Sequence, residues 1–296
     1  FRRVVKSIDS LVSDIEGILV NGIPSDTDPG IFEQYGKDLA TVLTNKLDRT
    51  NREFTLRMSN IGAPCVRKLW LEKNYPEDKI PFEANTFYKF RFGDIIEEDI
   101  IFLAALAGHR VEGRQKESEI AGIKGHRDVV IDGVLVDVKS CSPFSFIKFE
   151  KHLTPEQDSF GYIIQLMSYL EDAQTDDLVL EKNRAAFLAV DKQNGHLCLD
   201  FHQRDPEFDW VKFYEERKAI VDGNTIPDRA FQAKPDGYKN KNSGLFVPNG
   251  NELLDVECSY CDMKHKCWDN IRTFIRAGRP VYFTKVVKEP KLYEIN

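Results

Sequence analysis

The sequence feature that most constrains the fold is Asp132-Gly133, which lies between two short runs of β-branched and aliphatic residues. Asp-Gly between two such runs is the strongest short-range signal for a β-hairpin, and a two-residue turn fixes the register of its strands. In that register Ile131 faces Val134, and Asp128 faces Asp137. Directly opposed residues have Cβ atoms about 4.5–5.5 Å apart, so two carboxylates placed there destabilise the hairpin unless a cation compensates them.

Lys139 adds a positive charge to the same face of this hairpin. Side chains alternate along a strand, so Lys139, two residues beyond Asp137, points to the same side. The pattern predicts two carboxylates and one ammonium group at a single place, which suits the binding of a divalent cation. The alternative is a solvated hairpin whose charges simply face water.

The composition is that of a globular protein with a sizeable core, since 42% of the 296 residues are hydrophobic. The net charge of −7 argues against a protein that coats nucleic acid through an overall positive field, so a nucleic-acid role needs local basic patches or metal ions at an acidic site. No apolar run approaches the roughly 18 residues of a membrane span. We therefore expect no membrane partner and a cytoplasmic, intracellular location, in the host cell if the chain is viral.

Hydrophobic spacing and turn signals predict the other elements. Helices are expected at 4–20, 31–47, Phe92–Ala107 and Asp209–Val221, and a further helix opens at the capping box Thr154-Pro155-Glu156-Gln157 and runs to about Asp172. Strands are expected at Ala185–Val190 and His196–Phe201, joined across Asn194-Gly195. Residues 234–250 are rich in Lys, Asn, Gly and Pro and are expected to form a long loop.

Three cysteines, Cys258, Cys261 and Cys267, lie within ten residues of one another. Thiolates at this spacing let one loop wrap a metal ion or cluster. A fourth ligand must come from elsewhere, and Cys65 is the candidate, with His265 as a weaker one. Zinc accepts either residue, whereas a four-iron cluster prefers four cysteines, so the ligands alone leave the metal open.

Two of the predicted helices carry polar residues of interest. Tyr162, Gln165 and Tyr169 line one stripe of the helix that ends near Asp172, although such a stripe is usually the solvated side. Glu97 and Glu98 stand beside apolar residues on the earlier helix, so at least one of them is expected to be partly buried. A buried carboxylate needs a partner or a metal ion.

The chain carries four short motifs in the order Gly93-x3-Glu97, Gly125-x2-Asp128, Asp137-x-Lys139 and Gln165-x3-Tyr169. This ordered set resembles the RecB-like branch of the PD-(D/E)xK nucleases. One cysteine before them in a Cys-x-Arg-Lys context, and Cys-x2-Cys-x5-Cys after them, make the chain similar to the iron-sulfur nucleases related to AddB and to the CRISPR adaptation nucleases. The resemblance spans roughly residues 59–268, and many iron-sulfur relatives carry histidine at the position of Glu97.

The resemblance implies an α/β, restriction-endonuclease-like fold, in which a mixed sheet is flanked by helices. The nuclease core is expected at 59–232, a helical N-terminal extension at 1–58, and a loop, the cysteine cluster and a tail at 233–296. In such a fold Glu97, Asp128, Asp137 and the Val138 carbonyl would hold one or two Mg²⁺ or Mn²⁺ ions, which polarise the scissile phosphate and lower the pKa of an attacking water.

The resemblance also implies roles for the remaining motif residues. Lys139 would orient the water or offset developing phosphorane charge, and Gln165 and Tyr169 would position the lysine and the DNA backbone. The cysteines expected to hold a [4Fe-4S] cluster, or zinc as the alternative, are Cys65, Cys258, Cys261 and Cys267. Candidates for contacts with the DNA backbone are Arg67 and Lys68, and further Arg110, Arg114, Lys148 and Lys151.

We therefore expect a metal-dependent DNA exonuclease that cleaves phosphodiester bonds at free ends in recombination, repair or CRISPR adaptation, together with partner proteins of those systems. A non-catalytic DNA-binding adaptor with the same fold is the first alternative, although a site without catalytic activity has no physical need for opposed carboxylates. A zinc-stapled RNA-processing nuclease is the second alternative, because the cysteine ligands alone do not identify the bound metal.

Overall fold

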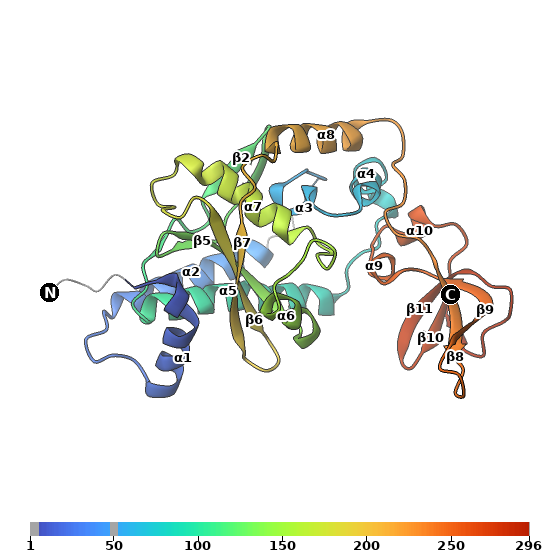
Figure 1. Ribbon diagram of the computed structural model, residues 1–296, viewed down its shortest axis with the longest axis horizontal. Coiled ribbons are helices and arrows are strands. Elements are labelled where there is room, and N and C mark those ends of the chain that lie inside the picture. Colours follow the sequence, from blue (N-terminus) through green and yellow to red (C-terminus); the bar gives the residue numbers. More distant parts are fainter. Residues whose placement is uncertain (1–5, 48–52, 296) are drawn as a thin grey trace. The chain divides into compact units, whose positions relative to one another are not determined.

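The computed structural model describes residues 6–47 and 53–295, which fall into two compact units (Figure 1). The first unit comprises the described residues up to Ala63 together with Phe82–Glu216, and the second comprises Pro64–Pro81 and the described residues from Arg217 onward. Residues 64–81 thus belong with the C-terminal part of the chain. The three-part division expected from the sequence stays a prediction. No helix in the described part is long and apolar enough to cross a membrane.

A five-stranded mixed sheet with the strand order β1-β4-β5-β6-β7 forms the centre of the first unit. Its strands are β1 (Val111–Glu112), β4 (Val129–Ile131), β5 (Val134–Cys141), β6 (Arg184–Asp191) and β7 (Leu197–Gln203). Strands β5 and β6 run parallel, and the other neighbours run antiparallel. The expected α/β class, with a mixed sheet flanked by helices, is confirmed at this level.

Helices cover both faces of this sheet (Figure 1). They are α1 (Leu11–Asn21) and α5 (Ala84–Leu106) on one face, and α6 (Pro143–Glu150) and α7 (Tyr162–Asp172) on the other. Val136 and Leu188 pack with α1 and α5, whereas Leu135 and Phe187 pack with α6 and α7. Because side chains alternate along β5, its polar residue Asp137 lies on the same side as Leu135, the side of α7.

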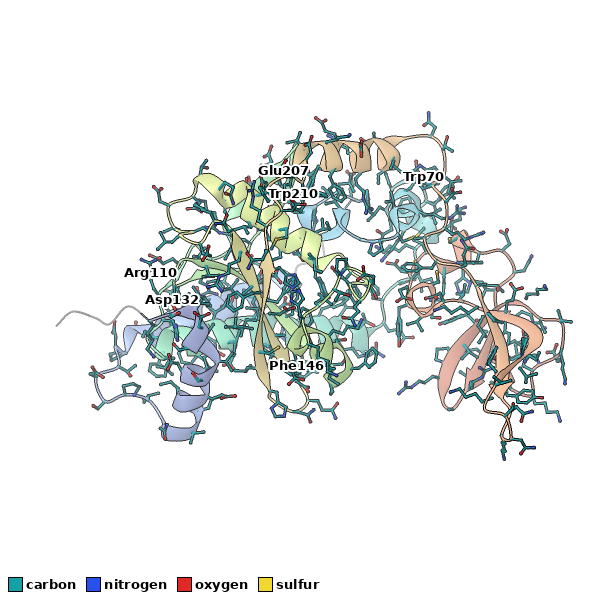
Figure 2. All side chains as sticks on the ribbon, in the orientation of Figure 1. Trp70, Arg110, Asp132, Phe146, Glu207 and Trp210 are labelled. Atoms are coloured by element: carbon teal, nitrogen blue, oxygen red, sulfur yellow. The ribbon has the colours of Figure 1, made fainter. Side chains whose placement is uncertain are left out.

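The predicted hairpin is confirmed, and β4 pairs with β5 in the expected register. The paired residues are Val129 with Val136, Val130 with Leu135, and Ile131 with Val134. One step further along this register, Asp128 stands opposite Asp137. At the turn Asp132 and Gly133 have φ angles of +50° and +83°, as a type I′ turn requires. The N–H of Arg110 donates to Asp132 Oδ1 over 2.9 Å and holds the turn in place (Figure 2).

Most of the other predicted elements of the first unit are also present. Besides those named above, it contains η1 (Ile8–Ser10), α2 (Gly30–Leu47), α3 (Met58–Ile61), β2 (Glu117–Ile120), β3 (Ile123–His126) and η3 (Ala173–Thr175), and α8 (Trp210–Asp222) contains the division between the units. The helix predicted at 4–20 corresponds to η1 and α1, with residues 4 and 5 outside the described part. The helix predicted from Phe92 begins earlier, at Ala84. Strands β6 and β7 confirm the predicted hairpin around Asn194-Gly195.

The capping box predicted at Thr154–Gln157 is wrong, because this segment forms a turn and α7 begins only at Tyr162. Asp158 caps α7 instead: its carboxylate accepts from the N–H of Ile163, in the first turn, over 2.8 Å and from the N–H of Gly161, just before the helix, over 2.9 Å. Gly161 has φ +80°, and a Cβ there would come within 2.3 Å of the backbone of Gly62. This close approach of two glycines fixes where α7 starts.

The second unit is built around a five-stranded antiparallel sheet with the order β12-β10-β11-β9-β8. Its elements are α4 (Val66–Asn74), η2 (Pro76–Asp78), β8 (Lys234–Lys239), β9 (Phe246–Leu253), α9 (Val256–Ser259), α10 (Lys264–Cys267), β10 (Arg272–Arg276), β11 (Arg279–Lys285) and β12 (Tyr293–Ile295). The long loop predicted at 234–250 is wrong, because β8 and β9 form a hairpin there. Strand β8 lies at the sheet edge, where Pro235 and Gly237 are tolerated.

Candidate functional site

Two opposed carboxylates occupy the end of the β4–β5 hairpin that lies away from its turn. Asp128 Oδ2 accepts a hydrogen bond of 2.8 Å from the N–H of Val138. Asp137 is 1% exposed and forms an ion pair with Lys139, but neither of its oxygens has a hydrogen bond of normal geometry. A buried carboxylate oxygen without a hydrogen bond is costly, so Asp137 Oδ1, which has no hydrogen-bond partner, is available to a further partner such as a cation.

Glu97, from α5, shares the electrostatic field of these two aspartates. Burial raises the pKa of Glu97 to about 7, and the negative charges of Asp137 and Glu98 add to this effect. Burial also raises the pKa of Asp128 well above 3.8, with further contributions from Asp137 and Glu97. The pKa of Asp137 is raised by burial although Lys139 opposes the shift. Burial raises the pKa of all three carboxylates, and Asp137 adds to the rise for the other two, so a cation bound here would favour their ionised forms.

Lys139 is held in a polar and aromatic setting. Burial lowers its pKa, but the neighbouring carboxylates outweigh burial and raise the pKa above 10.5, so the ammonium group stays charged. Its Nζ donates to Gln165 Oε1 over 3.4 Å, and Gln165 Nε2 donates to the Tyr169 hydroxyl over 3.4 Å. The ammonium group also lies 4.5 Å from the ring centroid of Tyr162. The structure thus brings together the predicted Glu97, both aspartates and the three residues that follow them in the motif order.

Gly125 makes room for Tyr169. A Cβ at Gly125 would meet the Tyr169 ring at 2.9 Å and the Met58 side chain at 2.7 Å. Burial raises the pKa of Tyr169 to about 12, so its hydroxyl keeps its proton at neutral pH. Gly93, by contrast, has no atom within 4 Å of an added Cβ, and packing does not explain this glycine.

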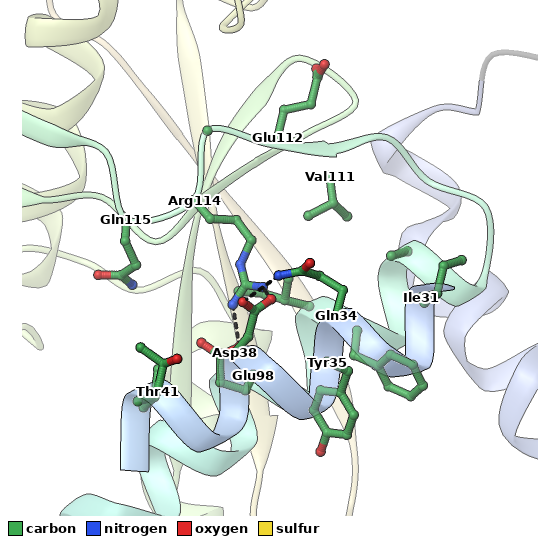
Figure 3. A pocket seen from close by; sticks show the side chains of 15 residues that line it. Ile31, Gln34, Tyr35, Asp38, Thr41, Glu98, Val111, Glu112, Arg114 and Gln115 are labelled. Carbon is green, nitrogen blue, oxygen red and sulfur yellow. Dashed lines mark hydrogen bonds and ion pairs between the residues drawn. The ribbon is translucent and has the colours of Figure 1, made fainter. Parts of the chain in front are cut away.

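The neighbouring Glu98 faces a cavity of about 580 Å³ between α2, α5 and the segment after β1 (Figure 3). Arg114 forms ion pairs there with both Asp38 and Glu98. This arginine, a predicted DNA contact, therefore joins α2 to α5. Glu97, the residue before Glu98, has a partner of its own: its Oε1 accepts a hydrogen bond of 2.9 Å from Gln115 Nε2.

The other predicted contacts in the first unit differ in their surroundings. Arg110 pairs with Glu112 over 2.9 Å, and Lys148 donates to the carbonyl of Gln157 over 2.9 Å. Lys151, which ends α6, is exposed. A role of these residues in DNA binding stays a prediction.

The four cysteines predicted as ligands all belong to the second unit. Cys65 precedes α4, and the other three lie in or beside α9 and α10. Burial raises the pKa of Cys258 to about 12, and interactions with Cys261, Cys267 and Cys65 contribute to the rise. The four thiols are therefore in electrostatic range of one another, although they come from two separate segments of the chain.

Arg67 and Lys68, predicted as DNA contacts, have partners around these cysteines. Arg67 Nε donates to Cys267 Sγ over 3.2 Å, and its Nη1 donates to the carbonyl of Pro227 over 2.7 Å. Lys68 Nζ lies 3.3 Å from a carboxylate oxygen of the buried Asp262. Both cations thus contribute to the second unit itself, and contact with DNA stays a prediction.

A further group of side chains was not expected from the sequence. His152, Asp200 and His202 each place one ligand atom within 4.8 Å of the others, and among the described residues this is the one such group. The three carboxylates of the first site lie farther apart, so a single shared ion would draw them together. The usable sequence signal is Asp200-x-His202 on a strand, which puts both side chains on one face, whereas His152 is distant in sequence.

Comparison with known proteins leaves the function open. No family model matches this chain, and no curated protein matches it. One similar solved structure bears the description "Crystal structure of SSO0001"; it is 15% identical and aligns over 62% of this chain and 83% of that chain, with a TM-score of 0.39. A score this low does not establish a common fold, so the function has to be argued from the site itself.

Proposed function

We propose that this protein is a metal-dependent nuclease that cleaves DNA phosphodiester bonds, acting as an exonuclease on free ends in recombination, repair or CRISPR adaptation. The observation that carries the proposal is the group of the buried Asp137 and the half-buried Glu97 and Asp128 beside a charged Lys139, in which Asp137 has no hydrogen bond of normal geometry. A restriction-endonuclease-like arrangement of the mixed sheet and its helices is part of the same proposal.

The donor atoms at this site fit Mg²⁺ or Mn²⁺. Both ions prefer oxygen ligands, and carboxylates on α5, on β5 and directly before β4 supply them. Glu97, Asp128 and Asp137 would hold one or two ions, with the Val138 carbonyl as a further ligand. When bound, such an ion polarises a phosphate and lowers the pKa of an attacking water.

Lys139 contributes a fixed positive charge next to these ligands. Because its pKa is raised, it stays protonated at neutral pH and can offset negative charge that develops on the phosphate. Gln165 and Tyr169 act as positioning residues, since the amide accepts from Lys139 and in turn donates to the phenol. Gly125 keeps the phenol within reach of this chain of hydrogen bonds.

We also propose that the four cysteines hold a [4Fe-4S] cluster. Four sulfur donors from two chain segments suit such a cluster, and Arg67 donates to the sulfur of Cys267, the kind of hydrogen bond that tunes iron-sulfur centres. Zinc is the alternative, because it also accepts four thiolates. In either case the metal would tie residues 64–81 to the C-terminal part of the second unit.

Incubation of the purified protein with end-labelled linear DNA and with covalently closed circular DNA tests the activity. We expect degradation of linear DNA with Mg²⁺ or Mn²⁺, none with EDTA, and resistance of the closed circle. Lys139→Ala should be inactive, whereas Lys124→Ala, which alters an exposed lysine on β3, should remain active. Binding without cleavage under all conditions would favour the DNA-binding adaptor, and preferential cleavage of labelled RNA would favour an RNA-processing nuclease.

A further inference from the structure

His152 occupies an unusual backbone position at the end of α6. Its φ is +71°, in the left-handed region where glycine or asparagine is the normal choice. For other residues this conformation is strained, because the Cβ atom comes too close to a backbone carbonyl oxygen. The side chain of His152 points at a buried carboxylate: its Nδ1 lies 2.7 Å from Asp200 Oδ1.

Asp200 is the centre of this group. It is 3% exposed and lies on β7, and its second oxygen lies 3.0 Å from Nε2 of His202. The same oxygen accepts a hydrogen bond of 2.9 Å from the N–H of Leu153. The two imidazole rings are stacked with their centroids 4.7 Å apart. Two ring nitrogens and one carboxylate oxygen therefore converge from the end of α6 and from β7.

We propose that His152, Asp200 and His202 form a binding site for a divalent transition-metal ion of the zinc type. Imidazole and carboxylate are ligands that zinc accepts, and three protein ligands leave a coordination position for water or another ligand. The side chain of His152 is 61% exposed, whereas those of Asp200 and His202 are buried, so the open position faces solvent.

The surroundings of the three residues hold them in place. The N–H of Leu153 fixes the carboxylate of Asp200, as the outer-shell partners of metal ligands commonly do. The ring of Phe187 packs edge-on against His202, with centroids 5.2 Å apart. Side chains that are already oriented in this way lose less freedom when they bind an ion.

This site is separate from the proposed nuclease site. Asp137 is paired with Phe187 on β6, and Phe187 is paired with Asp200 on β7, so the three residues form one row across the sheet. Neighbouring strands are about 4.8 Å apart, which puts the two aspartates about 10 Å apart along the row. The zinc-type site therefore does not depend on the nuclease proposal.

Metal content after equilibrium dialysis against Zn²⁺ tests the proposal, with the full chain and His152→Asn compared directly. Asparagine accepts the left-handed conformation, and position 152 is exposed, so this variant is expected to fold. His126→Asn, at an exposed histidine on β3, is the matched control. We expect the wild type and the control to hold one more zinc ion per chain than His152→Asn. The loss of an outer-shell partner alone weakens metal affinity about 10–100-fold, so the loss of the His152 imidazole, a direct ligand, should weaken zinc affinity more than 100-fold.

Co²⁺ in place of Zn²⁺ separates this site from the cysteines. The difference spectrum between wild type and His152→Asn should show weak ligand-field bands without thiolate charge transfer. Equal zinc content in the two proteins would overturn the proposal and leave a hydrogen-bonded His-Asp-His network, even if the variant melts at a lower temperature. Thiolate bands in the difference spectrum would overturn it as well.

Discussion

Replacing Glu97 by glutamine should stabilise the metal-free protein above neutral pH. The pKa of Glu97 is raised from 4.5 to about 7 in the folded protein, so its folded form binds a proton more tightly than its unfolded form. A difference of one pKa unit corresponds to about 1.4 kcal/mol, so the ionisation of this one group removes about 3 kcal/mol of stability. Glutamine has nearly the same shape and cannot ionise, so Glu97→Gln avoids this loss.

The sign of the effect depends on pH. Below about pH 4.5 Glu97 is protonated in the folded and unfolded states, and wild type and Glu97→Gln should be about equally stable. As pH rises from about 4.5 to about 7, the wild type loses stability and the variant does not, and above pH 7 the difference levels off with the variant ahead by about 3 kcal/mol. Added Mg²⁺ should stabilise the wild type at that pH, because the ion binds the folded state preferentially, and should stabilise the variant less.

Urea denaturation in EDTA between pH 4 and pH 8, followed by helical circular dichroism, measures this difference. The signal comes mainly from the first unit, which holds the long helices α2 and α5. Glu16→Gln, at an exposed glutamate on α1, is the matched control and should follow the wild type apart from small differences. If Glu97→Gln shows the same dependence on pH as the wild type, the pKa of Glu97 is not raised by burial beside Asp137 and the proposed ion site is wrong.

Three further predictions concern the same chain. Lys139→Ala should abolish cleavage but not DNA binding. In EDTA at pH 8 its free energy of unfolding should be lower by about 3 kcal/mol, the usual cost of breaking a buried ion pair. Undiminished cleavage would refute the role of the lysine. Asp137→Asn should remove both activity and the Mg²⁺-induced rise in Tm, whereas the control Asp132→Asn, in the hairpin turn, should keep both. An intact Mg²⁺ response in Asp137→Asn would contradict an ion shared by the carboxylates. Anaerobically purified protein should be brown and contain iron and sulfide, and Cys258→Ala should be pale and less stable; stoichiometric zinc without iron would instead establish the zinc alternative.

The hairpin was predictable because its signal is local. Asp132 and Gly133 both adopt positive φ, and once a two-residue turn is set, every pair along β4 and β5 follows from it. The facing of Asp128 and Asp137 thus needed only the sequence between them. The position of Glu97 near these aspartates depends instead on how α5 packs against the sheet. Only the resemblance to a nuclease family indicated that position.

The two wrong predictions have different physical causes. Thr154–Gln157 has the composition of a capping box, but the contact between Gly62 and Gly161 moves the start of α7 to Tyr162, and Asp158 takes over the capping. This contact joins residues that are far apart in the sequence, so local propensity could not anticipate it.

The loop predicted at 234–250 failed for a reason of sheet topology. Proline and glycine are depleted in central strands, but an edge strand needs hydrogen bonds on one side only. Strand β8 is such an edge, and Gly237 is required there, since a Cβ would lie 2.2 Å from the carbonyl of Val247. The position of a strand within its sheet decides whether its composition is acceptable.

The row from Asp137 through Phe187 to Asp200 explains how two ion sites could work on one sheet face without interfering. The first site offers carboxylate oxygens, which suit Mg²⁺ and Mn²⁺, whereas the second offers two imidazoles, which favour zinc-type ions. The ring of Phe187 is buried between them, with its centroid 5.2 Å from that of the His202 ring and 5.9 Å from the Lys139 ammonium group. Phe187→Ala would open a cavity in the core, so it should lower stability by about 3–5 kcal/mol, while each site keeps its own class of ion because the two ligand sets stay about 10 Å apart. Metal contents of the folded variant that differ from those of the wild type, after dialysis against mixed Mn²⁺ and Zn²⁺, would contradict this independence of the two sites.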